Sequence, residues 1–135
     1  MREYFDKELT QLNDSLIEMG GLVEQAIKNT MKMIVDGEDL LDIAREHENC
    51  INEAEKSIQS RCLHLLLHQA PVAHDLRYVS AALKMITDLE RIGDQAVDIA
   101  EMSVYIKDKK QVFNLTHILE MGDNASKMVT EAIDA

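Results

Sequence analysis

A series of acidic residues at helical spacing is the feature of this sequence best suited to chemistry. Glu90 interrupts an apolar series, and Asp94, Asp98 and Glu101 continue the same side of a predicted helix. The apolar series comprises Leu76, Val79, Leu83, Ile86, Val97, Ala100 and Val104. Carboxylates one helical turn apart repel each other, so the series destabilises a helix unless cations lie between its members. Carboxylate oxygens bind hard cations, and the pattern therefore suggests a site for iron, manganese, magnesium or calcium.

A glycine and a second pair of oxygen-bearing side chains extend this candidate site. Gly93 lies beside the acids and costs a helix about 1 kcal/mol relative to alanine, which is easier to explain if something must fit there. Glu48 and Asn52 have the same four-residue spacing in an earlier predicted helix, and they could face the first group. The candidate metal ligands are Glu90, Asp94, Glu48, Asn52, Asp98 and Glu101.

Two other interpretations of the acidic residues are considered. The acids could form the solvated face of a structural bundle, with Glu90 paired to Arg91 or Arg45. They could also belong to a di-metal carboxylate enzyme, whose helices carry Glu-x-x-His motifs. No histidine of this sequence has a glutamate three positions before it, which argues against the enzyme. The sequence also has no Gly-rich phosphate loop and no nucleophile elbow, so we expect no catalytic residue.

Long helices must position these side chains. Apolar residues recur in steps of four and three from Phe5 to Met33, which predicts a helix over residues 2–35. Gly37 is suited to end it, and a second helix is expected over residues 40–68. A third helix starts near Pro71, which a first turn tolerates, and it carries two apolar seams. A helix with two seams touches two neighbours, so we predict an all-α fold, an antiparallel three-helix bundle.

A short internal repeat indicates more than one bundle. The segment LIEMG at residues 16–20 returns as ILEMG at residues 118–122, at an offset of 102 residues. We therefore expect residues 1–106 to form a first three-helix repeat. Residues 107–135 would be a linker and the first helix of a second, truncated repeat. The uncovered apolar face of that helix should pack on the first bundle or on another chain, so we expect a homo-oligomer.

Charge and hydropathy narrow the classes of partner and the location. The 135 residues contain 14 Lys and Arg against 25 Asp and Glu, a net charge of −11. Such a chain favours cations or basic surfaces over nucleic acid, which needs clustered basic residues. No apolar run approaches the roughly 20 residues of a membrane span. Cys50 and Cys62 lie too far apart on one predicted helix to form a disulfide, and free thiols suggest the cytoplasm.

Two motifs together resemble the PhoU family of phosphate-signalling regulators. Residues 69–77 read QAPVAHDLR and residues 88–96 read DLERIGDQA. The family pattern is a QQPVA-x-DLR turn followed by a helix that reaches DLERIGD-x-A at about this spacing. Ala70 departs from the second glutamine of the turn. The resemblance implies two repeats of a three-helix bundle, which would explain the internal repeat.

The resemblance also implies a function. A PhoU-like protein would be a cytoplasmic adaptor, without catalytic activity, that negatively regulates phosphate uptake and phosphate-starvation signalling. Its partners would be the ATPase of a phosphate ABC transporter and a sensor histidine kinase, and it would reach the membrane only through them. The family binds metal, commonly multinuclear iron, through E(D)xxxD motifs; Glu90 and Asp94 match one, whereas Asn52 replaces the acid in the counterpart that begins at Glu48. The alternative is a structural or oligomerisation bundle without a metal.

Overall fold

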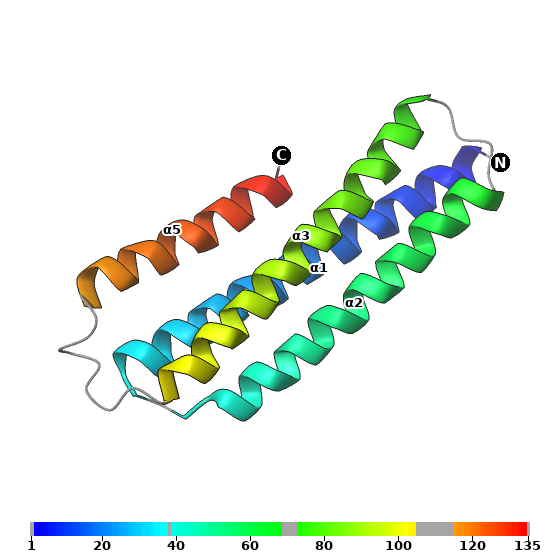
Figure 1. Cartoon of the computed structure of the whole chain (residues 1–135). Helices are drawn as coiled ribbons and strands as arrows, with labels where there is room; N and C mark the ends of the chain where they lie inside the picture. The colour runs from blue at the N-terminus through cyan, green and yellow to red at the C-terminus, as the bar shows by residue number, and fades with distance from the viewer. Residues whose placement is uncertain (1, 38, 69–72, 105–114, 135) are drawn as a thin grey trace.

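Four long helices account for most of the chain in the computed structural model, which describes residues 2–37, 39–68, 73–104 and 115–134. The helices are α1 (Arg2–Val35), α2 (Leu41–His68), α3 (Ala73–Val104) and α5 (Leu115–Asp134). Helices α1 to α3 run antiparallel to one another as a bundle, and α5 lies beside α1 (Figure 1). The predicted all-α bundle and the further helix after it are confirmed.

The ends of the first two helices follow from local backbone chemistry. The backbone turns after Val35, where Gly37 has a φ of 71°, a left-handed conformation that glycine adopts without strain. Asp39 then accepts a hydrogen bond from the amide of Leu41 at 3.4 Å and so caps the start of α2. The expected positions of Pro71 and of the polar linker at residues 107–110 lie outside the described residues.

The hydrophobic core lies between the three helices of the bundle. The predicted seam of α1 is buried or half-buried along its whole length, from Phe5 to Met33. It packs against α2 and α3, whose largest fully buried side chains are Ile51, Ile58, Leu65, Val79, Ile86 and Val97. Leu76 and Val104 of the predicted apolar series are exposed instead, and so are Ile43 of α2 and Ile99 of α3. The residue directly beside each of them is buried instead, namely Ala44, Asp75, Ala100 and Ser103, so the helix presents the adjacent side to the core at these points.

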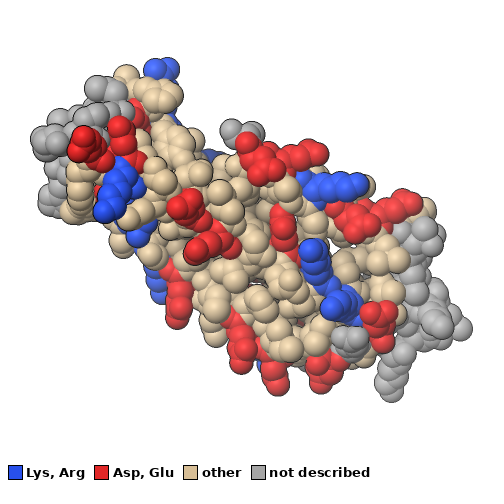
Figure 2. Space-filling view, turned by 180° about the vertical axis from the view of Figure 1, so that it is seen from behind, with Lys and Arg blue, Asp and Glu red and all other residues tan. Residues whose placement is uncertain are grey.

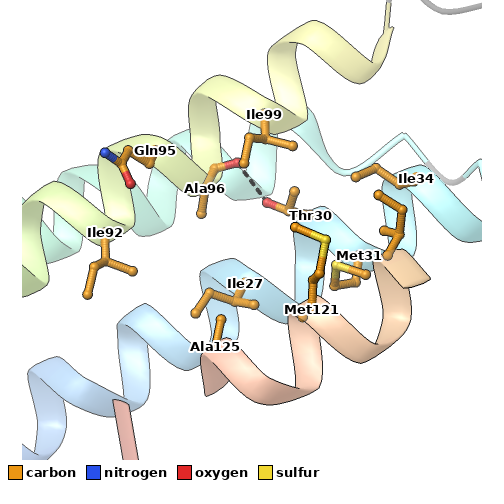
Figure 3. A pocket seen from close by; sticks show the side chains of 12 residues that line it. Ile27, Thr30, Met31, Ile34, Ile92, Gln95, Ala96, Ile99, Met121 and Ala125 are labelled. Carbon is orange, nitrogen blue, oxygen red and sulfur yellow. Dashed lines mark hydrogen bonds between the residues drawn. The ribbon is translucent and has the colours of Figure 1, made fainter. Parts of the chain in front are cut away.

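A buried hydroxyl ties α1 to α3. Thr30 is 4% exposed, and its hydroxyl lies 2.8 Å from the carbonyl oxygen of Ala96 and 3.0 Å from that of Ala26 (Figure 3). The hydroxyl can donate to either oxygen, so the bond to Ala96 links the two helices. This contact fixes their relative position near the end of α1.

Replacing this hydroxyl with a methyl group tests the link. We expect Thr30→Val to lower the free energy of unfolding by about 1 kcal/mol, because the buried bond is lost while the side-chain volume stays nearly the same. Thr10→Val is the matched control, since the exposed Thr10 hydroxyl bonds only to the carbonyl of Asp6 in its own helix. Urea denaturation of both variants measures the difference, and equal effects would contradict a role for the Ala96 bond.

The described helices also settle two expectations about the chain's chemistry. Both cysteines are free thiols, Cys50 exposed and Cys62 buried, as their separation predicted. Burial raises the pKa of the Cys62 thiol to about 11, which makes that thiol unreactive near neutral pH. None of the helices that the structure describes has the length and apolar character needed to cross a membrane.

Candidate functional site

The acidic residues chosen from the sequence lie where α2 packs against α3. Gly93 of α3 permits the close approach of the two helices, since a β-carbon built there would lie 2.9 Å from Cδ1 of Ile51 on α2. The space beside Gly93 is therefore filled by a core side chain of the protein itself. The expectation that something must fit against this glycine is correct, but the group that fits is Ile51.

Three carboxyl groups from the two helices are linked by hydrogen bonds. Asp94 of α3 bonds to Glu90 one turn before it and to Glu48 of α2 across the helix interface. Two carboxyl groups can bond to each other only if one of them keeps its proton. Glu48 of α2 and Glu90 of α3 thus both lie beside Asp94, close enough for the three carboxyl groups to influence one another.

The pKa values of this cluster reflect the crowding of acids. The hydrogen bond with Asp94 is the main cause that raises the pKa of Glu90 from 4.5 to about 7. Burial and the negative charges of Asp94, Glu55 and Glu48 raise it further. The pKa of Glu48 is also raised, first by burial and then by the charges of Asp94, Glu101 and Asp98. Each of these influences favours the neutral form of a carboxyl group.

Two residues belong to this site although the sequence did not single them out as members. Glu55 lies close enough to Glu90 to raise its pKa, and its position seven residues after Glu48 places both on one side of α2. Arg45 forms an ion pair with Glu101, with Nε and Oε1 3.6 Å apart. Arg45 had been considered as a partner of Glu90, but the structure pairs it with Glu101 at the end of the cluster.

The donor chemistry of the cluster fits a hard cation, whereas the present positions of the side chains do not enclose one. Glu48, Glu90 and Asp94 supply carboxylate oxygens, the ligands that such cations prefer. Asn52 is half-buried one turn beyond Glu48 on α2. Within the described parts of the chain, no three His, Cys, Asp or Glu side chains converge closely enough to hold a metal ion. A cation would thus have to draw the carboxylates together.

Acidic residues outnumber basic ones over the whole protein. Acidic side chains are spread over the face seen in Figure 2, with fewer basic side chains among them, in line with the net charge of −11. A field of one sign raises the local concentration of oppositely charged ions. The net negative charge should therefore favour cations over anions near the protein.

Comparison with known proteins identifies the chain's relatives. The PhoU domain pattern matches residues 16–103. A protein of Pseudomonas aeruginosa named "Phosphate-specific transport system accessory protein PhoU homolog" is 32% identical over 135 residues, which cover 98% of this chain and 56% of the relative. A protein of the same name from Clostridium acetobutylicum is 31% identical over 136 residues, covering 99% of this chain and 62% of the relative.

A solved structure shows that the fold is shared as well. The crystal structure of PhoU from Pseudomonas aeruginosa superposes with a TM-score of 0.88 at 32% identity, and the match covers 97% of this chain and 64% of that one. The chain thus spans between about half and two thirds of the length of these relatives. The domain match extends over most of α1, all of α2 and almost all of α3, including both acidic motifs. On this evidence the chain belongs to the PhoU family.

Proposed function

We propose that this protein is a cytoplasmic, non-catalytic accessory protein of phosphate transport that negatively regulates phosphate uptake and phosphate-starvation signalling. The observation that carries the proposal is the PhoU domain match over residues 16–103, together with the name that its relatives bear, accessory proteins of a phosphate-specific transport system. The partners we propose are the ATPase of a phosphate ABC transporter and a sensor histidine kinase. The protein would couple the two through the long faces of its helices and act as a homo-oligomer.

We further propose that a metal ion, with iron the favoured candidate, controls the shape offered to these partners. The ligands would be Glu48, Glu90 and Asp94, completed by Asn52, Asp98 and Glu101. The support is the juxtaposition of carboxyl groups from α2 and α3, which raise the pKa of Glu48 and of Glu90. A cation bound between them would join the two helices and fix their relative position.

Metal content is the direct test of this site. We expect the wild-type protein, purified without added metal, to contain iron or another of the hard cations, and the Glu90→Ala, Asp94→Ala double variant to lose most of it. The matched control is Glu46→Ala, Glu53→Ala, which removes two exposed acids of α2 and keeps the same net charge as the test variant. Elemental analysis measures the metal content of all three proteins. Full metal content in the test variant would refute the ligand assignment.

The competing function is a purely structural or oligomerisation bundle. It is favoured by the finding that no three candidate ligands converge within the described residues. Thermal unfolding with and without a chelator separates the two proposals. A structural bundle would contain no bound metal and would melt at the same temperature in both conditions, whereas a metal that joins α2 to α3 would raise the melting temperature.

We also propose that residues 1–106 are one PhoU-like repeat and that residues 107–135 begin a second, with α5 as the counterpart of α1. The support is the offset of 102 residues between LIEMG and ILEMG. At this offset Met121 corresponds to Met19, and Met128 corresponds to Ala26. Met19 and Ala26 are buried under α2 and α3, whereas Met121 and Met128 are 66% and 68% exposed. The exposed side of α5 is thus the side on which a second pair of helices would pack.

A further inference from the structure

The contact between α1 and α5 has an approximate two-fold symmetry. Gly20 of α1 is so close to Ile133 of α5 that an added β-carbon would lie 2.8 Å from its Cδ1. Gly122 of α5 is equally close to Met31 of α1, at 2.7 Å from Cγ. Both pairs of positions, 20 with 122 and 31 with 133, differ by 102, the offset of the sequence repeat. Each contact is therefore the symmetry mate of the other, as in a two-fold interface between identical helices.

Polar residues at the centre of the α1–α5 interface also occupy positions that differ by 102. The hydroxyl of Thr130 donates a hydrogen bond to the carboxylate of Glu24. Lys28 and Ser126 line the same hollow as Glu24 and Thr130. Positions 24 and 126, and positions 28 and 130, again differ by 102. The symmetry axis passes through this hollow, so α1 and α5 offer each other equivalent surfaces there.

We propose that the surface of α1 covered by α5 also binds a second copy of the chain through its own α1. In such a pair, Gly20 would lie against Met31 of the other copy, as Gly122 lies against Met31 here. Glu24 would replace Ser126, and Lys28 would replace Thr130, so that each Glu24 carboxylate meets a Lys28 ammonium of the other copy. The dimer therefore has two ion pairs between Glu24 and Lys28, whereas the α1–α5 contact has one hydrogen bond from a hydroxyl group at this place.

In the protein as it stands, α5 competes with a second copy for this surface. As part of the same chain, α5 has a high effective concentration at α1, so it prevails unless its contact is weakened. That contact is incompletely packed, because a cavity of about 240 Å³ lies between α1, α3 and α5 (Figure 3). Met31 of α1 and Met121 of α5 both line this cavity. Displacement of α5 would expose the surface and permit two copies to pair.

Substitutions at two equivalent buried positions test the proposal on the full chain. Val129 of α5 is 5% exposed and corresponds to Ile27 of α1, which is 8% exposed. Val129→Asp should release α5 and leave α1 intact, so we expect a concentration-dependent dimer by light scattering. Ile27→Asp alters α1 itself and should remain monomeric. A folded Val129→Asp variant that stays monomeric up to about 1 mM, the effective concentration of a short flexible linker, would overturn the proposal. Circular dichroism verifies that both variants remain helical.

Charge exchange establishes whether a dimer uses this surface. In the Val129→Asp background, Glu24→Lys should weaken the dimer about tenfold, because both ion pairs become repulsive. Adding Lys28→Glu restores two pairs of opposite charge and should restore the dissociation constant. If neither substitution changes the dissociation constant, the dimer is formed by another face of the protein. This result would also overturn the proposal.

Discussion

Replacing Gly93 with leucine is expected to lower the free energy of unfolding by about 3 kcal/mol, at the upper end of the range for adding carbon atoms to a packed core. A β-carbon at this position already lies within 2.9 Å of Cδ1 and 3.5 Å of Cγ2 of Ile51. Ile51 is 1% exposed, so other side chains of the core enclose it. The leucine must therefore push α2 away from α3, and the carboxyl cluster between them would separate. Urea denaturation gives the change in stability.

The same substitution at another glycine is the matched control. Gly21 of α1 is exposed, and a β-carbon there would meet nothing within 4 Å. Gly21→Leu should therefore stabilise the protein by up to about 1 kcal/mol through helix propensity alone.

Truncating the opposing side chain, Ile51, provides a second test of its contact with Gly93. Ile51→Ala alone should cost about 2 to 4 kcal/mol, but much less in the Gly93→Leu background, where it relieves the clash. Additive effects would show that the two residues are not in contact.

Most of the fold could be predicted because each helix repeats its apolar residues over many turns. The interval from Phe5 to Met33 contains no irregular step, and the predicted helix at 2–35 coincides with α1. Residues at helix ends were predicted less well. Leu76 continues the seam of α3 in the sequence, yet it is 43% exposed, whereas the adjacent Asp75 is 1% exposed. Periodicity shows which side of a helix is apolar, but at a helix end the side that faces the core can be the adjacent one.

The site could be predicted in part, since carboxylates in an apolar seam are visible in one sequence. The alignment of α2 with α3 cannot be predicted from one sequence, because it depends on which side chains of the two helices pack against each other. Ile51 against Gly93 sets that alignment, and it brings Glu48 to Asp94 and Glu55 towards Glu90. Glu55 has no feature in the sequence alone that separates it from the other acidic residues of α2. Glu55 lies two helical turns after Glu48 and therefore on the same side of α2, but this spacing indicates a site only when the residues of α3 opposite it are known.

Replacing Glu90 with glutamine is expected to stabilise the metal-free protein by about 2 kcal/mol at pH 8 and to have little effect at pH 4. The pKa of Glu90 is raised from 4.5 to about 7 in the folded state. Between these values the folded protein binds more protons than the unfolded chain, so the wild type loses stability as the pH rises from 4.5 to 7. The full shift corresponds to about 3 kcal/mol, which solvent screening of a half-buried carboxyl reduces.

The glutamine variant lacks this titration because its amide stays neutral and can donate to Asp94 as the protonated acid does. Its stability curve should therefore separate from that of the wild type through this pH interval and run parallel to it above pH 8. Glu53→Gln removes an equal charge from an exposed position of α2 and should change stability by less than about 0.5 kcal/mol at either pH. Chelator-treated samples followed by urea denaturation from pH 4 to pH 9 provide the curves. If Glu90→Gln and Glu53→Gln behave alike, the carboxyl groups do not share a proton, and the helices come together without the repulsion that a cation would relieve.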